Sequence, residues 1–127
     1  MSYWIFVMAG NRSEFIEMIK MKRWPIYKRT NNRMNIKKGD KVLFYLAGSH
    51  RRKIVADAVL SSSLKDDGDE FSIGISKIKL WKKQILIKSF VESLEFIKNK
   101  TKWGVFMQGG VVRITDRDFE ILSNKLL

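Results

Sequence analysis

Two short segments of this chain are apolar at every position, and they limit the possible folds more than any other feature. Residues 3–8 have the sequence YWIFVM, and residues 42–47 have the sequence VLFYLA. A half-buried strand alternates apolar and polar side chains, whereas a strand that is apolar throughout must be covered on both faces. The sequence therefore predicts a sheet with packed layers on both sides of its central strands.

Other segments are predicted as further strands of this sheet. Residues 53–60 follow the second apolar run after a short polar connection, which predicts an antiparallel hairpin. Residues 71–87 alternate with shifts of phase, so we expect one long strand with a bulge or break near residues 81–83. Residues 105–107 are predicted as a short strand that the glycine pair at 109–110 ends, and residues 111–114 precede the last helix.

Three short helices are predicted around these strands. The first follows a cap at Asn11 or Ser13 and ends near residue 21. The second opens between residues 89 and 93. The last follows Thr115, which forms an approximate capping box with Asp118. Its predicted buried face consists of Phe119, Ile121, Leu122 and Leu126.

Together these elements predict a single domain over residues 1–127 with an α+β fold. Consecutive strands pair as antiparallel neighbours, and the helices do not alternate regularly with the strands. We therefore expect a small, mostly antiparallel β-barrel with short flanking helices. The chain length agrees with one domain, since typical domains have ~100–150 residues.

The charge balance indicates a polyanionic partner. Lys and Arg number 25 against 13 Asp and Glu, which gives a formal net charge of +12. A field of this sign concentrates polyanions and speeds their encounter. We expect nucleic acid as the partner, and an anionic membrane surface is the alternative. The apolar run at residues 3–9 is too short for a signal peptide or a membrane span, so we expect a soluble cytoplasmic protein.

The sequence lacks the residue patterns of common enzyme classes. It has no cysteine, which excludes disulfides, thiolate metal sites and cysteine nucleophiles. It contains no GxSxG elbow, no P-loop and no GxGxxG motif. The single histidine, His50, is expected in an exposed loop, and the acidic segment 66–70 does not have the spacing of an EF-hand. We therefore expect no catalytic residue, no metal and no cofactor.

Two basic segments, residues 22–38 and 98–104, each surround a tryptophan. Neither segment shows a regular pattern, so both are predicted as loops. Their cations would neutralise phosphates, and the rings of Trp24 and Trp103 would stack on unpaired or flipped bases. The alternative is that the tryptophans close the ends of the barrel and the lysines form a solvated face. The predicted phosphate-binding residues are Lys22, Arg23, Lys28, Arg29, Arg33, Lys98, Lys100 and Lys102.

The order of these segments resembles the EVE domain family. The resemblance is carried by SYWI at residues 2–5, the basic loop around Trp24, IKKGDKVLFY at residues 36–45, and LEFIKNK at residues 94–100 followed by Trp103. It covers essentially the whole chain. The chain departs from the family after Trp24, where Pro25 stands in place of the usual glycine or aspartate–glycine pair.

This resemblance implies a PUA-like fold, related to YTH and ASCH domains, with a pocket for one modified base of RNA or DNA, such as a methylated cytosine or adenine. The leading hypothesis is thus a reader module without chemistry of its own. The alternatives are a general PUA-like RNA-binding protein, a nucleic-acid-processing enzyme and a protein-interaction module. The pocket residues that the resemblance implies are Asn11, Trp24, Ile26, Tyr27, Tyr45, Trp103 and Phe106.

Overall fold

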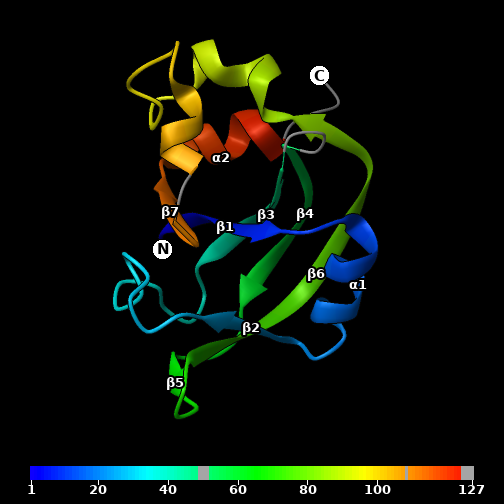
Figure 1. The fold of residues 1–127 in the computed structure, drawn as a ribbon, viewed down its shortest axis with the longest axis vertical. Helices are drawn as coiled ribbons and strands as arrows, with labels where there is room; N and C mark the ends of the chain where they lie inside the picture. Colours follow the sequence, from blue (N-terminus) through cyan, green and yellow to red (C-terminus); the bar gives the residue numbers. More distant parts are fainter. Residues whose placement is uncertain (49–51, 108, 124–127) are drawn as a thin grey trace.

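The computed structural model describes residues 1–48, 52–107 and 109–123, which form one curled sheet with short helices on both sides (Figure 1). In this part of the chain the sheet has seven strands in the order β2-β6-β4-β3-β1-β7, with β5 paired to β6. The strands are β1 (Tyr3–Ala9), β2 (Arg23–Ile26), β3 (Lys41–Ala47), β4 (Lys53–Leu60), β5 (Lys65–Asp66), β6 (Phe71–Leu86) and β7 (Val111–Ile114). The helices are α1 (Arg12–Ile19), the 3₁₀ helices η1 (Ile87–Ser93) and η2 (Trp103–Met107), and α2 (Asp116–Ser123).

Most neighbouring strands run antiparallel, and the sheet curls into a half-barrel, which confirms the predicted α+β fold of a small, mostly antiparallel barrel with short flanking helices. The exception is the pair β1 and β3, which run parallel from Tyr3 opposite Lys41 to Ala9 opposite Ala47. Their connection contains α1 and β2, and so it is long enough for the crossover that a parallel pair requires. The parallel pair places the carboxyl ends of β1 and β3 side by side.

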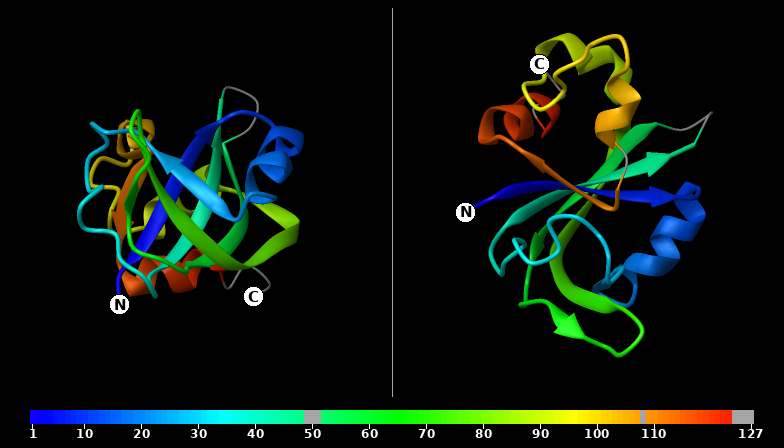
Figure 2. Two further views of the ribbon diagram at one scale, coloured as in Figure 1. Left: turned by 90° about the horizontal axis from the view of Figure 1, so that it is seen from below. Right: turned by 60° about the vertical axis from the view of Figure 1, so that its left-hand side comes forward.

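Layers cover both faces of the sheet, as the two apolar runs predicted. Trp4 and Phe6 of β1 belong to an inner cluster with Phe15 of α1 and Trp24 of β2. Ile5 points the other way, into an outer cluster formed with residues of η1, η2 and α2. Figure 2 (right) shows α1 on one side of the sheet and α2 with the 3₁₀ helices on the other. The ring centroids of Phe6 and Trp24 lie 6.2 Å apart, so this contact brings β2 against β1 and curls the sheet.

β6 contains the break in pairing that the phase shifts predicted. Its register with β4 shifts between Ile54 and Ala56, which lie opposite Ile85 and Leu80. The extra residues of β6 form a bulge. Trp81 within the bulge is buried, and its Nε1 donates to the Asp57 carboxylate at 2.6 Å. This hydrogen bond anchors the bulge to β4.

A buried aspartate joins the start of the chain to the turn before β3. Asp40 is 4% exposed. Its carboxylate accepts hydrogen bonds from the Ser2 backbone N–H at 2.9 Å, from Trp4 Nε1 at 2.9 Å and from the Lys37 backbone N–H at 3.0 Å. Gly39 beside it has a φ of +94°, a conformation that glycine adopts without strain. The turn at residues 38–41 therefore holds β1 against β3.

The prediction that residues 22–38 form a loop throughout is wrong for its first part. β2 pairs with β6 from Arg23 opposite Gly74 to Ile26 opposite Phe71. Pro25 hides this strand in the sequence, because proline cannot donate to a ladder of hydrogen bonds. β2 is an edge strand, where a missing donor is tolerated.

Two smaller expectations about the helices also change. Residues 105–107 belong to the 3₁₀ helix η2 rather than to a strand. α1 is capped by Asn11, one of the two predicted caps, with Glu14 completing a capping box, and the helix ends at Ile19. His50 and Leu126 lie outside the described residues. None of the helices within residues 1–48, 52–107 and 109–123 has the length and hydrophobicity needed to cross a membrane.

The cap of α2 is only half of the predicted box. The Thr115 hydroxyl accepts from the Asp118 backbone N–H at 3.0 Å. The Asp118 carboxylate is fully buried and accepts from the backbone N–H groups of Glu95 and Phe96 at 2.8 and 2.9 Å. Asp118 therefore ties α2 to the segment that follows η1, instead of closing its own helix.

Candidate nucleic-acid interface

A cavity opens at the carboxyl ends of the parallel strands β1 and β3. Its volume is about 600 Å³, which lies within the ~300–1,000 Å³ typical of small-molecule sites. None of the described side chains that line it carries a charge. We call it the β1 cavity, and it is lined by Val7, Met8, Ala9, Met18, Trp24, Tyr27, Ala47, Met107, Gly109 and Gly110.

Two segments far apart in the sequence meet at the β1 cavity. One contributes Trp24 and Tyr27, from β2 and the residues after it, and the other contributes the end of η2 and the glycines before β7. The Val7 N–H donates to the Gly110 carbonyl at 2.9 Å, which ties the second segment to β1. Asn32 Nδ2 donates to the Val111 carbonyl at 3.2 Å, which ties it to the loop that follows Tyr27.

The two aromatic side chains of the β1 cavity are held differently. Trp24 is 3% exposed, and its ring centroid lies 4.8 Å from that of Phe44 and 5.9 Å from that of Phe15. Tyr27 is 73% exposed. Trp24 is therefore a fixed wall that also belongs to the core, whereas the Tyr27 ring is free to stack on a planar group at the rim.

Trp24 and Tyr27 are the predicted pocket residues that line the β1 cavity. No residue of the predicted segment 98–104 lines the β1 cavity, although Met107 at the end of η2 does, and the rings of Trp24 and Trp103 belong to different clusters. The other predicted residues are Ile26, buried in the inner cluster, Asn11, which caps α1, and Tyr45, Trp103 and Phe106, all in or against the outer cluster.

Tyr45 lies beside a cation in the outer cluster. Burial raises the pKa of the Tyr45 phenol, and the positive charge of Arg52 partly opposes that rise. The Arg52 guanidinium also lies over the Trp103 ring, 5.6 Å from its centroid. The phenol therefore stays protonated at neutral pH, and Arg52 connects two of the predicted pocket residues outside the β1 cavity.

Half of the predicted phosphate-binding side chains already form hydrogen bonds or ion pairs with other groups of the protein. Lys28 Nζ lies 2.7 Å from the Asp66 carboxylate, and Lys100 Nζ donates to the carbonyls of Val91 and Leu94 at 3.0 and 2.6 Å. The remaining occupied groups are Arg23, bonded to the Ser72 hydroxyl, and Arg33, bonded to the Thr30 carbonyl.

The other half are exposed and have no side-chain hydrogen bond or ion pair within the described part of the chain. They are Lys22, Arg29, Lys98 and Lys102. Exposed cations of this kind exchange bound counterions for phosphates without breaking a contact of the fold. We expect these four to be better phosphate ligands than the occupied four.

The acidic loop before β6 is held by hydrogen bonds. The Lys28 ammonium, together with the Gly68 backbone N–H, lowers the pKa of the Asp66 carboxyl. The same ammonium lies 4.7 Å from the centroid of the Phe71 ring. Over the described residues, no three His, Asp or Glu side chains are grouped so that they could hold a metal ion.

Sequence reasoning missed most of the lining of the β1 cavity. Three methionines, Met8, Met18 and Met107, look like core residues in the sequence because they are apolar. Ala9 and Ala47, the small residues at the ends of β1 and β3, have no sequence feature that would indicate a cavity. The available signal was the pair Gly109 and Gly110, since a glycine pair between apolar segments often marks a close approach of backbone.

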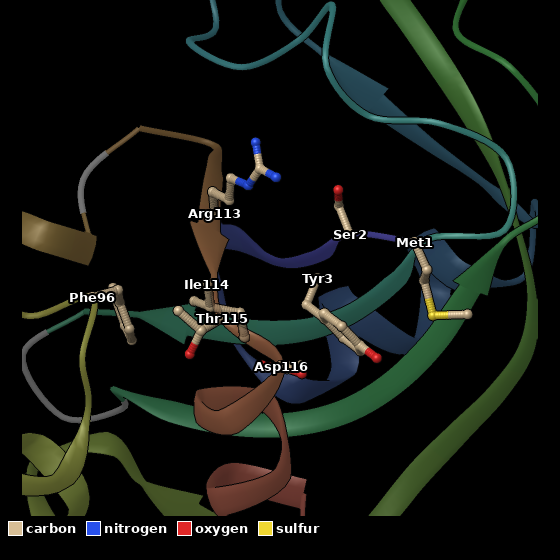
Figure 3. A pocket seen from close by; sticks show the side chains of 8 residues that line it. All are labelled: Met1, Ser2, Tyr3, Phe96, Arg113, Ile114, Thr115 and Asp116. Carbon is tan, nitrogen blue, oxygen red and sulfur yellow. The ribbon is translucent and has the colours of Figure 1, made fainter.

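A second cavity of about 590 Å³ lies where the amino-terminal residues meet β7 and the start of α2 (Figure 3). Its charged side chains, Arg113 and Asp116, have opposite signs. Arg113 lies over the Trp4 ring at 5.7 Å, and the Tyr3 ring packs against Phe119 at 5.0 Å. Because its charge is mixed and its two aromatic side chains, Tyr3 and Phe96, already pack against the outer cluster, this cavity is a weaker candidate for a nucleic-acid site.

Comparison with known proteins gives a consistent assignment. The sequence matches the EVE domain family over residues 2–125. A UPF0310 protein of Pyrococcus abyssi is 26% identical over 144 residues, covering 99% of this chain and 100% of that protein.

Two solved structures show the same fold with bound nucleic acid. Human THYN1 in complex with DNA containing 5-methylcytosine superposes with a TM-score of 0.67 at 14% identity, covering 98% of each chain. The YTH domain-containing protein Mmi1 in complex with RNA superposes with a TM-score of 0.55 at 14% identity, covering 97% of this chain and 81% of that one. At this level of identity these similarities establish the PUA-like fold.

Proposed function

The chain belongs to the EVE domain family, and from this membership and the β1 cavity we propose that it is a nucleic-acid-binding module that holds a single base. The base enters the β1 cavity, and exposed cations nearby hold the flanking phosphates. The module carries out no reaction. Binding and release of the strand are its whole activity.

The observation that carries this proposal is the lining of the β1 cavity. A nucleobase is flat and has apolar ring faces, which suit a fixed Trp24 wall and an exposed Tyr27 ring. The described lining of this cavity has no charged side chain, so it offers no counter-ion to a free phosphate or carboxylate. The charged side chains of the described residues lie outside this lining, and the net charge of +12 favours a polyanionic strand.

The same lining supports recognition of a methylated base. Each methyl group that leaves water for an apolar site contributes about 0.8 kcal/mol, or roughly fourfold in affinity. Met8, Met18 and Met107 have flexible thioethers that adapt to the shape of an added methyl group. The complexes of THYN1 with 5-methylcytosine DNA and of Mmi1 with RNA support this proposal and make both polymers necessary in its test.

We expect Tyr27→Ala to weaken binding of a single strand with a methylated base by about 5–150-fold, because base–aromatic stacking contributes ~1–3 kcal/mol. Fluorescence anisotropy titrations with DNA and RNA strands, methylated and unmethylated, measure the effect. Tyr27→Phe keeps the ring and should keep the affinity.

Met34→Ala is the matched control, since Met34 is 69% exposed and does not line the β1 cavity. Equal affinity of the wild type and Tyr27→Ala for every strand would exclude stacking at this rim. Equal affinity of the wild type for methylated and unmethylated strands would instead favour a general nucleic-acid-binding domain without modification readout.

A further inference from the structure

The longest strand of the sheet has one edge that is only partly covered. β2 pairs with β6 only from Phe71 to Gly74, and the Ile75 N–H donates to the Lys22 carbonyl at 3.0 Å. Beyond Ile75, no strand in the described part of the chain pairs with this edge, while β4 occupies the other edge as far as Leu86. In Figure 1 this part of β6 runs along one side of the molecule, from β2 to η1.

The uncovered part of β6 is basic. It carries Lys77, Lys79, Lys82 and Lys83, all exposed, and β6 contains no Asp or Glu. No ion pair or side-chain hydrogen bond engages these four lysines within the described residues. We call them the β6 strip. The acid closest to it in register is Asp57, opposite Lys79, whose carboxylate accepts the hydrogen bond from Trp81.

The bulges of β6 shape this strip. Lys77 has a φ of +50°, in the left-handed region that is unfavourable for lysine, where the register between β4 and β6 first shifts. The second shift contains Lys82 and Lys83, next to the anchored Trp81. Bulges re-aim side chains and interrupt pairing at sheet edges. Both interruptions in β6 therefore coincide with exposed lysines.

The β6 strip is connected to the lining of the β1 cavity through the turn before β2. Lys22, whose carbonyl bonds Ile75, lies in the turn between α1 and β2. The residues on either side of that turn, Met18 and Trp24, line the cavity. At ~3.3 Å per residue, Lys77 to Lys83 covers roughly 15–20 Å, about the rise of five nucleotides that stay stacked as in one strand of a duplex, at 3.4 Å each, and fewer nucleotides of an extended strand.

We propose that the β6 strip is a second nucleic-acid contact, which binds the phosphates of the strand several nucleotides away from the base held in the β1 cavity. The identity of the ligand in this inference rests on the proposed function, whereas the position of the site follows from the exposed lysines of β6 alone. It makes the strip a source of affinity without base preference, because phosphate contacts carry no sequence information.

A different role for the same lysines makes an opposite prediction. Lysines on an uncovered edge strand prevent two sheets from pairing edge to edge. In that case their removal would cause self-association and would leave nucleic-acid affinity unchanged. The two roles are therefore separated by measuring affinity and oligomeric state on the same variant.

The test uses the full chain with Lys77, Lys79, Lys82 and Lys83 all changed to Gln, titrated with a short strand of about 4 nucleotides and a long strand of about 16 nucleotides. Both strands carry the same methylated base. We expect the variant to lose at least tenfold in affinity for the long strand only. The slope of log affinity against log salt should fall by roughly 2–3, since each lost phosphate contact contributes ~0.7 for single strands.

The control variant changes four exposed basic residues outside β6 to Gln, which lowers the net charge equally. Its positions are outside both basic segments and outside the lining of the β1 cavity, and they are Lys20, Lys65 and Lys88 together with the exposed Arg12. A second variant, with the β6 strip changed to Arg, keeps the charge and should keep both the affinity and the slope. Circular dichroism and sedimentation report the fold and oligomeric state of each. If the fourfold Gln variant does not fold, the pair Lys77→Gln and Lys79→Gln should show about half of the change in slope.

The outcomes distinguish the two proposals. If the fourfold Gln variant binds the short strand normally and keeps the wild-type affinity and salt slope for the long strand, the proposed role of the β6 strip is wrong. The proposed base site in the β1 cavity would not be affected. An equal loss in the strip and control variants would also overturn the role of the strip, because net charge alone would then explain the effect. Failure of the wild type to bind either strand would overturn the proposed function, and the strip with it.

Discussion

We expect Asp40→Ala to lower the free energy of unfolding by about 3–5 kcal/mol. The carboxylate accepts three hydrogen bonds, and bonds to a charged group contribute ~1.5–3 kcal/mol each, without being additive. The Trp4 indole N–H is in a fully buried ring, so water cannot easily replace its acceptor. Domains of this kind are stable by only ~5–15 kcal/mol in total. The loss corresponds to a fall of about 10–20 °C in Tm.

Urea denaturation followed by circular dichroism measures this loss, with Asp69→Ala as the matched control. Asp69 is an exposed acid in the loop before β6, so its removal should change the free energy of unfolding by less than about 0.5 kcal/mol. A similar small effect of Asp40→Ala would show that the contact between β1 and the turn at Asp40 contributes little to stability. Asp40→Asn, which retains one acceptor oxygen, should lie between the two.

The sequence was informative wherever one segment determined its own environment. The runs at residues 3–8 and 42–47 must be buried on both faces, and they are β1 and β3 with layers on each side. The phase shifts in residues 71–87 are a local property of one strand, and the bulge lies at Trp81 as expected. Gly39 and Asp40 are residue types that favour turns, and they form the turn before β3.

Features that depend on two distant segments were not predictable in the same way. The parallel pairing of β1 with β3 follows from the crossover through α1 and β2, and the strand β2 was hidden by Pro25. The β1 cavity exists only because of that pairing. Its methionines could not be distinguished from core residues, since apolar lining and apolar core have the same composition. The aromatic residues were noticed, but their clusters depend on which face of the sheet each one covers.

Trp24 shows how both interpretations of a tryptophan can hold at once. It was predicted as a pocket residue, with closure of the barrel as the alternative. In the structure its ring packs on Phe6, Phe15 and Phe44 and also lines the β1 cavity. A substitution at this position therefore acts on folding and on the proposed binding together, and the two effects must be separated by design.

We expect Trp24→Ala to lower the free energy of unfolding by about 3–5 kcal/mol, the usual range for a large aromatic residue removed from a core. We also expect it to abolish the preference for a methylated over an unmethylated strand. Trp24→Phe keeps a ring in the inner cluster and should lose less stability, yet it shortens the wall of the β1 cavity. Anisotropy titrations under conditions where each variant is folded give the dissociation constants for the methylated and the unmethylated strand. The ratio of these two constants does not depend on the fraction of active protein.

Trp103→Ala is the comparison that locates the pocket. Trp103 is half-buried against the outer cluster, under Arg52, and it does not line the β1 cavity. Its removal should therefore cost less stability than that of Trp24 and should leave the methylation preference unchanged. If Trp103→Ala removed the preference while Trp24→Phe kept it, the base would have to lie beside Tyr45 and Arg52, on the opposite face of the sheet. Because the two tryptophans lie in different clusters, a single pair of variants decides which face of the sheet binds the base.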